Sequence, residues 1–192
     1  YRIEVEDRIA RSTDFTLTAA DRAALIAAGN PQAASLSRVG FFVNDFDTTT
    51  TGLDIVTSLE TDHFGGNTTY SVAFNWNDTE VDSFTPGIIS EARVKKLEES
   101  LPKTKGFFTV NHQRNNWHVL ARLNYYGSFY EDHLDSDVVR AEDGGLPIFE
   151  GSAVTVDLET GWDFDSGLYL RIGAQNAFDK TPDDNPWGAA VA

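Results

Sequence analysis

The side chains that could do chemistry in this chain are histidines and carboxylates, because it contains no cysteine. The four histidines are His63, His112, His118 and His133. None of them forms a pair with another ligand at a metal-binding spacing on one predicted face, so we predict no metal site. The sequence has no Gly-x-Ser-x-Gly elbow and no persuasive nucleophile–base pair. We therefore expect that the protein is not an enzyme and that it uses no cofactor.

A second group of potential ligands is an acidic stretch that begins at residue 131. Its carboxylates are Glu131, Asp132, Asp135, Asp137, Glu142 and Asp143. They lack the glycine and the distal glutamate of a calcium-binding loop, so we prefer to interpret them as a solvated acidic loop. The formal net charge of the chain is -15, which argues against a nucleic-acid partner.

The clearest structural element is a hairpin over residues 152–182. Apolar side chains fall on every second residue before the turn, namely Val154, Val156, Leu158, Trp162 and Phe164, and again after it, at Leu168, Leu170, Ile172 and Ala174. This period of two is the pattern of a strand with one apolar face. A three-residue turn Asp165-Ser166-Gly167 pairs Phe164 with Leu168, Trp162 with Leu170, and Leu158 with Ala174. Gly167 then occupies the left-handed position of the turn.

The same alternation predicts five further strands, at residues 1–12, 39–62, 68–81, 104–112 and 117–129. Short helices are expected at residues 18–28, where Thr18 and Asp21 form a capping box, and at 90–100. The connections between the seven strands alternate between long and short. All short turns therefore lie at one end of the sheet and all long loops at the other.

This asymmetry is typical of outer-membrane β-barrels. The chain has no run near the roughly 20 apolar residues of a membrane helix, but a barrel strand needs about 10 residues with every second one apolar. We therefore predict an all-β fold: an antiparallel up-and-down meander of about seven strands that forms part of a transmembrane β-barrel. A soluble β-sandwich or jelly roll is the alternative.

Several segments resemble the C-terminal part of the barrel of TonB-dependent outer-membrane receptors. Asn176-Ala177-Phe178-Asp179-Lys180 is similar to the asparagine-leucine-phenylalanine-aspartate-lysine signature of that family, with Ala177 in place of leucine. The segments 41–47 and 51–55, Leu101-Pro102-Lys103, and residues 122–127 also resemble family patterns. Together these segments cover nearly the whole chain.

The resemblance implies a receptor in the bacterial outer membrane that takes up a scarce ligand, such as a ferric siderophore, with energy from the TonB complex. It also implies a plug, earlier strands and a final strand that residues 1–192 do not contain, so we expect a barrel-wall fragment that does not close by itself. The expected partners are a small-molecule ligand, outer-membrane lipid and, through the missing plug region, the TonB complex.

This interpretation assigns three groups of site residues. An aromatic girdle at the membrane interface consists of Trp76, Trp117 and Trp162. Charges on the lumen side that face a plug, or simply pair across strands, are Arg122, Asp157, Glu159 and Arg171. Candidates for ligand contact near the outer ends of the lumen face, which the family uses, are Asn75, Asn77, Tyr126, Tyr130 and Gln175. Rival functions are a passive porin-like channel, a soluble sandwich module that binds carbohydrate, and an acidic interaction fragment.

Overall fold

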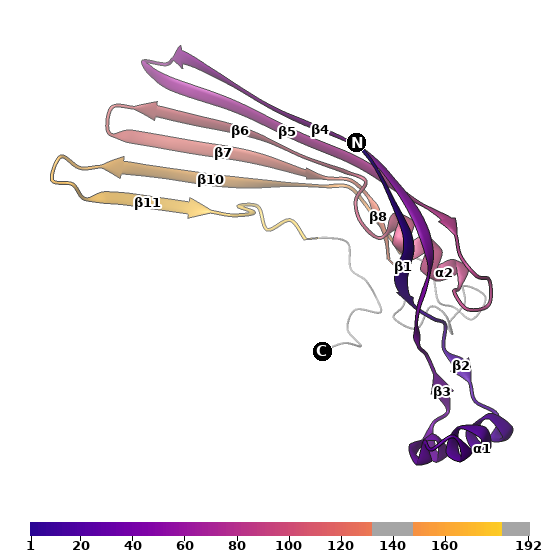
Figure 1. Ribbon diagram of the computed structural model, residues 1–192. Coiled ribbons are helices and arrows are strands. Elements are labelled where there is room, and N and C mark those ends of the chain that lie inside the picture. The colour runs from indigo at the N-terminus through magenta and orange to yellow at the C-terminus, as the bar shows by residue number, and fades with distance from the viewer. Residues whose placement is uncertain (132–147, 182–192) are drawn as a thin grey trace.

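The structure is a computed structural model that describes residues 1–131 and 148–181 (Figure 1). The strands are β1 (Arg2–Arg11), β2 (Phe15–Thr16), β3 (Arg38–Val39), β4 (Phe42–His63), β5 (Gly66–Ser83), β6 (Thr104–Arg114), β7 (Trp117–Tyr126), β8 (Phe129–Glu131), β9 (Ile148–Glu150), β10 (Ala153–Asp163) and β11 (Tyr169–Ala174). The helices are α1 (Ala19–Ala27), the 3-10 helix η1 (Pro31–Ser35) and α2 (Glu91–Glu99). The prediction of an all-β fold with a few short helices is confirmed.

Seven of the strands form one antiparallel sheet in the order β1-β4-β5-β6-β7-β10-β11. Strands that follow one another in this sheet are therefore neighbours, as in a meander. The tight turns that join β4 to β5, β6 to β7 and β10 to β11 lie together at one end (Figure 1). The elements α1, α2 and β8 lie toward the other end, where the longer connections run (Figure 1).

The hairpin of β10 and β11 has the register that its sequence predicts. Leu158 lies opposite Ala174, and Trp162 lies opposite Leu170. The Phe164 amide donates to the Leu168 carbonyl oxygen at 2.8 Å and closes the turn. Gly167 has a φ of 84°, the left-handed conformation that a side chain would disfavour.

The two predicted helices are also present, and each begins at its predicted cap. The Thr18 hydroxyl accepts from the Asp21 amide at 3.2 Å, and the Asp21 carboxylate accepts from the Thr18 amide at 2.8 Å. These reciprocal bonds form a capping box. The hydrogen bonds from Thr18 hold the pKa of the Asp21 carboxyl below its usual range. In α2 the Ser90 hydroxyl accepts from the Arg93 amide at 3.2 Å.

Two strands depart from the predicted pattern. The apolar side chains Ile3 and Val5 of β1 lie opposite Thr50 and Thr48, on the other side of the sheet from Leu53. The prediction of one long strand over 117–129 is also wrong at its end. The ladder stops at Tyr126, and β8 pairs instead with β9 in a separate two-stranded ribbon. Alternation alone does not reveal where a strand leaves its neighbour.

The sheet is a single open layer. Within residues 1–131 and 148–181, β11 is paired with β10 alone, and β1 covers β4 no further than Thr51. The buried hydrophobic side chains of this part of the chain are Leu17, Ala33, Phe46, Ile89 and Tyr130. Phe46 lies near the start of β4 and the others lie in the connections between strands of the main sheet. The middle of the sheet therefore has no core beneath it.

Gly161 is a position in the sheet where a side chain has little room. A Cβ atom there would meet the His118 ring and the Arg171 side chain, and would lie 2.6 Å from the Leu170 carbonyl oxygen. The backbone oxygen cannot move away cheaply, and overpacking of this kind costs about 1–3 kcal/mol.

We therefore expect Gly161→Ala to lower the free energy of unfolding by about 1–3 kcal/mol in a urea titration. Ser58→Ala, on an exposed position of β4, is the control and changes it by about 0.5 kcal/mol or less. Equal stability of Gly161→Ala and the unsubstituted protein would contradict this account of the packing.

Candidate functional site

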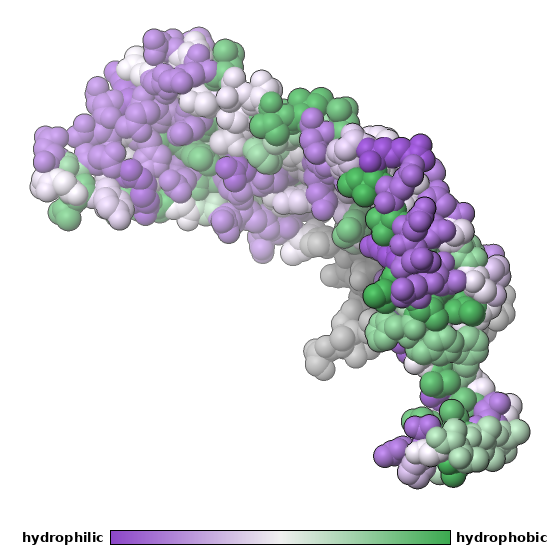
Figure 2. Space-filling view, viewed as in Figure 1, coloured by the Kyte–Doolittle hydropathy of each residue, from purple (hydrophilic) through white to green (hydrophobic). Residues whose placement is uncertain are grey.

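One side of the sheet is an exposed apolar surface, which we call the apolar face. Its members alternate along β4 to β7, β10 and β11 and lie opposite one another across the ladder. They include Leu53, Ile55, Leu59, Val72, Trp76, Phe108, Trp117, Leu123, Tyr125, Val154, Leu158, Trp162, Leu170 and Ile172. Figure 2 shows hydrophobic patches at the surface among the hydrophilic side chains that dominate the visible side of the sheet.

No second layer of the described chain covers the apolar face. Leu158 is 43% exposed, Trp162 46%, Leu170 51% and Ile172 64%. Full burial of one such side chain is worth about 1.5–3 kcal/mol, so a dozen half-exposed ones forfeit on the order of 10 kcal/mol in water. That is comparable to the whole stability of an ordinary domain. The apolar face therefore requires an apolar medium or partner.

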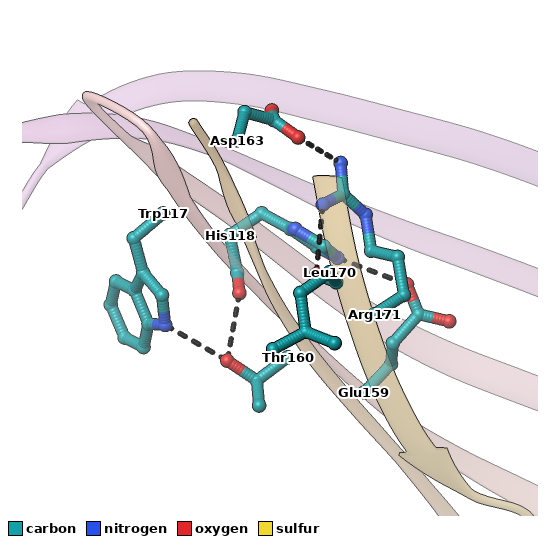
Figure 3. Close-up of polar contacts among 7 residues, drawn as sticks. All are labelled: Trp117, His118, Glu159, Thr160, Asp163, Leu170 and Arg171. Atoms are coloured by element: carbon teal, nitrogen blue, oxygen red, sulfur yellow. Dashed lines mark hydrogen bonds and ion pairs between the residues drawn. The ribbon is translucent and has the colours of Figure 1, made fainter. Parts of the chain in front are cut away.

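The three tryptophans of the predicted girdle lie on the apolar face in two rows. Trp117 and Trp162 are opposite each other beside the tight turns. The indole of Trp117 donates from Nε1 to the Thr160 hydroxyl at 2.8 Å (Figure 3). Trp76 lies opposite Thr104, where the pairing of β5 with β6 ends, so it belongs to a different row. Aromatic side chains thus flank the apolar face at both ends.

The opposite side, the polar face, carries the four predicted charges, and each has a partner outside that set. Arg122 lies opposite Asp157 in the ladder, but its Nε donates to the Thr109 hydroxyl at 3.0 Å. Its guanidinium lies over the Phe107 ring, 5.3 Å from the centroid. Asp157 accepts from Asn124 Nδ2 at 2.9 Å. Arg122 and Asp157 are therefore neighbours across the strands, as expected. Their hydrogen bonds, however, go to the neutral side chains Thr109 and Asn124.

Glu159 and Arg171 form no contact with each other, and each is drawn with a different partner (Figure 3). The Glu159 carboxylate lies 2.9 Å from Nε2 of His118, whose side chain is 11% exposed. Arg171 instead forms an ion pair with Asp163 at 2.7 Å. Both acids are diagonal to Arg171 in the register, and His118 engages Glu159.

Two of the five predicted ligand contacts lie in one hollow of the polar face. Asn75 and Tyr126 line a cavity of about 410 Å³ together with Lys105, Phe107 and other side chains. Asn75 Nδ2 donates to the Asp54 carboxylate at 2.6 Å. Asn77 continues this polar network one row further on, because its Nδ2 donates to Asn75 Oδ1 at 2.9 Å.

The other two predicted contacts lie elsewhere. Tyr130 belongs to β8, outside the main sheet, and is 7% exposed with the Lys95 ammonium 4.5 Å from its ring centroid. Gln175 follows the end of β11, opposite neither Asn75 nor Tyr126. Tyr130 therefore lies off the main sheet, which corrects its placement beside Asn75, while the placement of Gln175 stays a prediction. Tyr130 lies off the main sheet because the chain turns away from that sheet after Tyr126.

The hollow also contains residues that the sequence analysis did not select. Lys105 lies opposite both Asn75 and Tyr126, and Asp54 lies opposite Asn75. Counting residues back from the β4–β5 turn would have placed Asp54 there, because cross-strand partners share a face. Phe107 had no such signal, since it is an apolar residue on the polar side.

The segment Asn176–Lys180 forms a closed loop that fixes the end of β11. The Asn176 side chain donates to the Lys180 carbonyl oxygen at 2.9 Å and accepts from the Lys180 amide at 3.0 Å. Its own amide donates to the Asp157 carboxylate at 2.9 Å. Asn176 has a φ of 46°, a conformation that asparagine tolerates better than most residues.

The described ranges contain neither a metal-binding cluster nor a membrane-spanning helix. No group of three or more His, Asp or Glu side chains there is placed to hold a metal ion. None of the helices in those ranges is long and apolar enough to cross a membrane. The predicted acidic loop lies outside the described residues, except for the backbone of Glu131.

Comparison with protein-family models and with curated proteins finds no match for the chain. The likeness to a receptor family therefore depends on the segments named in the sequence analysis.

We expect Asn176→Ala to destabilise the end of the sheet, because it removes two hydrogen bonds and a residue suited to a positive φ. The free energy of unfolding should fall by about 1–3 kcal/mol, and the β11 amides should exchange their hydrogens faster. Gln175→Ala, the exposed neighbour, should change neither quantity. If both variants exchange at the unsubstituted rate, the loop does not hold β11.

Proposed function

We propose that the chain is part of the wall of a TonB-dependent receptor in the bacterial outer membrane. The intact receptor takes up a scarce small ligand, such as a ferric siderophore. The observation that carries this proposal is the exposed apolar face on a single-layer meander. A soluble sandwich would cover such a face with a second sheet, and the described residues supply none.

The dimensions of the apolar face support a bilayer as its medium. On β7 it extends from Trp117 to Tyr125, eight residues further along the strand. At about 3.4 Å per residue this distance is roughly 27 Å, and a strand tilt near 40° reduces the height to about 20 Å. The apolar band of outer-membrane barrels is about 25 Å tall, with aromatic girdles at both edges. The two tryptophan rows fit those edges.

The polar face supports a wet interior. Its charges and amides bond to one another across strands, as in the contacts of Asn75 with Asp54 and of His118 with Glu159. Such contacts are stable beside water and costly in lipid. The long connections at one end and the tight turns at the other agree with outer loops and periplasmic turns.

The proposal of this particular family is supported by the hydrogen bonds of its motif. The asparagine and lysine of Asn176–Lys180, which carry the resemblance, are the two residues that close the loop at the end of β11. The energised step, the plug and the partner in the inner membrane are part of the proposal through this resemblance alone.

Two leucines of β7 offer a matched test of the membrane orientation. Leu123 lies on the apolar face and Leu120, three residues earlier, on the polar face. In lipid bilayers, Leu123→Arg should lower the free energy of unfolding by about 2–4 kcal/mol, because a cation in the bilayer middle is poorly solvated. Leu120→Arg should change it by about 0.5 kcal/mol or less.

The same experiment also tests the rival fold, a soluble β-sandwich. The unsubstituted protein should fractionate with outer membranes and need detergent for extraction. Recovery of folded protein in a detergent-free supernatant, with Leu123 and Leu120 equally tolerant of arginine, would rule out the proposed wall.

Transport is tested with the protein expressed from its complete reading frame in iron-limited cells. Uptake of iron from a panel of ferric siderophores should depend on expression and should stop when an uncoupler removes the proton gradient. A passive channel would continue to admit its solute after uncoupling, so persistent uptake would favour that rival.

A further inference from the structure

The apolar face ends beside the tight turns in a row of bases and aromatic rings. His63 of β4 lies opposite Gly66 of β5. A Cβ atom on Gly66 would lie 2.9 Å from the Cβ atom of Arg114, so these two residues are also neighbours. Arg114 in turn lies opposite Trp117, and Trp117 lies opposite Trp162. The five residues form one line across β4, β5, β6, β7 and β10, which we call the turn row.

The next line of residues on the apolar face is mostly polar. It contains Thr61, Thr68, His112, Val119 and Thr160. The Thr68 hydroxyl lies 2.8 Å from Nδ1 of His112, and the Thr160 hydroxyl accepts from the Trp117 indole. Polar side chains are costly in hydrocarbon, so in the proposed orientation the hydrocarbon ends at this line. The turn row then lies at the level of the lipid headgroups.

Two donors of the turn row are free to bind another molecule. In residues 1–131 and 148–181, neither the Arg114 guanidinium nor Nε1 of Trp162 has a hydrogen-bonding or charged partner. The Arg114 side chain lies over the β4–β5 turn, because a Cβ atom on Gly65 would be 3.4 Å from its Nε. Trp162 is 46% exposed. The donors that remain unsatisfied are therefore at the surface of the apolar face.

The charge at this end of the apolar face is basic. Between the tight turns and Trp76, every Asp, Glu, His, Lys or Arg that the described strands β4 to β11 place on this face is a base, namely His63, His112 and Arg114. The chain as a whole has 15 Lys and Arg residues against 30 Asp and Glu residues. At the other end of the face, Lys103 is neutralised by an ion pair with Asp78. Arg114 therefore differs from Lys103 in having no acid beside it on its face.

The acids near the tight turns belong to other surfaces. Glu60, Asp62 and Asp163 lie in the register of the polar face. Asp165, in the β10–β11 turn, accepts from Asn116 Nδ2 at 3.0 Å. An anion that approaches along the apolar face therefore meets Arg114 without a competing carboxylate in the turn row.

A phospholipid matches the turn row in both chemistry and position. A guanidinium binds phosphate oxygens through parallel hydrogen bonds, and an indole places its ring in apolar surroundings and its N–H among headgroups. Phe64, which is 82% exposed at the β4–β5 turn, adds an aromatic surface beside the row. The apolar face next to the row accommodates acyl chains. A free phosphate ion would leave that apolar surface uncovered, so the complementary anion is one that carries acyl chains.

We infer that the turn row binds the phosphate of an anionic phospholipid, in the leaflet at the end of the sheet with the tight turns. Arg114 supplies the charge and Trp162 a second donor. The inference deepens the proposed function and rests on it for the orientation of the sheet in a bilayer. It concerns the lipid around the wall and is independent of which ligand the receptor takes up.

The test measures which lipid occupies the turn row. The protein is expressed from its complete reading frame, purified in nonionic detergent and labelled with a fluorophore at Ser166→Cys in the exposed β10–β11 turn. It is titrated with phosphatidylglycerol or phosphatidylcholine that carry identical acyl chains with a nitroxide quencher. Phosphatidylglycerol should quench with an affinity about fivefold higher, the factor that one base contributes near an anionic lipid.

Arg114→Gln should reduce this preference to less than about twofold, and Arg114→Lys should retain most of it, because the charge stays. The matched control is Arg38→Gln, which removes one exposed positive charge from β3, away from the tight turns (Figure 1), and should leave the preference unchanged. A second measurement needs no variant at Arg114. Raising the salt concentration from 0.1 to 1 M shortens the screening length from about 10 to about 3 Å and should remove the preference.

Three results would overturn the inference. They are equal affinity for the two lipids, a preference that survives Arg114→Gln, and displacement of phosphatidylglycerol by millimolar inorganic phosphate, which would indicate a site for a bare anion. The proposed function fails separately. A lipid preference without energised uptake would leave the turn row as a lipid site and remove the transporter. Energised uptake without a lipid preference would leave the transporter and remove the lipid site.

Discussion

The antiparallel backbone ladder is the constraint on which this structure depends. It joins seven strands in sequence order, and its period of two assigns each side chain to one of two faces. Because the ladder from β4 to β11 has no register shift beyond Thr48, a leucine on one strand and a tryptophan on the next meet on the same side without any core to guide them. The backbone bonds hold the sheet, while the medium on the apolar side determines whether it is stable.

This dependence explains why the polar face carries more specific contacts than the apolar face. Contacts between apolar side chains have few geometric demands, whereas charged and amide groups form directional hydrogen bonds. Gly161 shows this crowding, because a Cβ atom there would meet both the His118 ring and the Arg171 side chain. The pairs His118–Glu159 and Arg171–Asp163 lie around this glycine.

The sequence predicted the features that depend on local rules, namely a hairpin register and a helix start. Alternation and the Asp165-Ser166-Gly167 turn were sufficient for the β10–β11 register, and Thr18 with Asp21 was sufficient for the start of α1. It did not predict choices that depend on bulges or on competition. The side of the sheet on which Ile3 lies depends on how β1 is aligned along β4. The partner of Arg171 depends on which of the two diagonal acids His118 engages. The departure of β8 from the sheet had one signal in residues 117–129, because Gly127 directly follows the last residue of β7 and an isolated glycine in a strand pattern often marks a break.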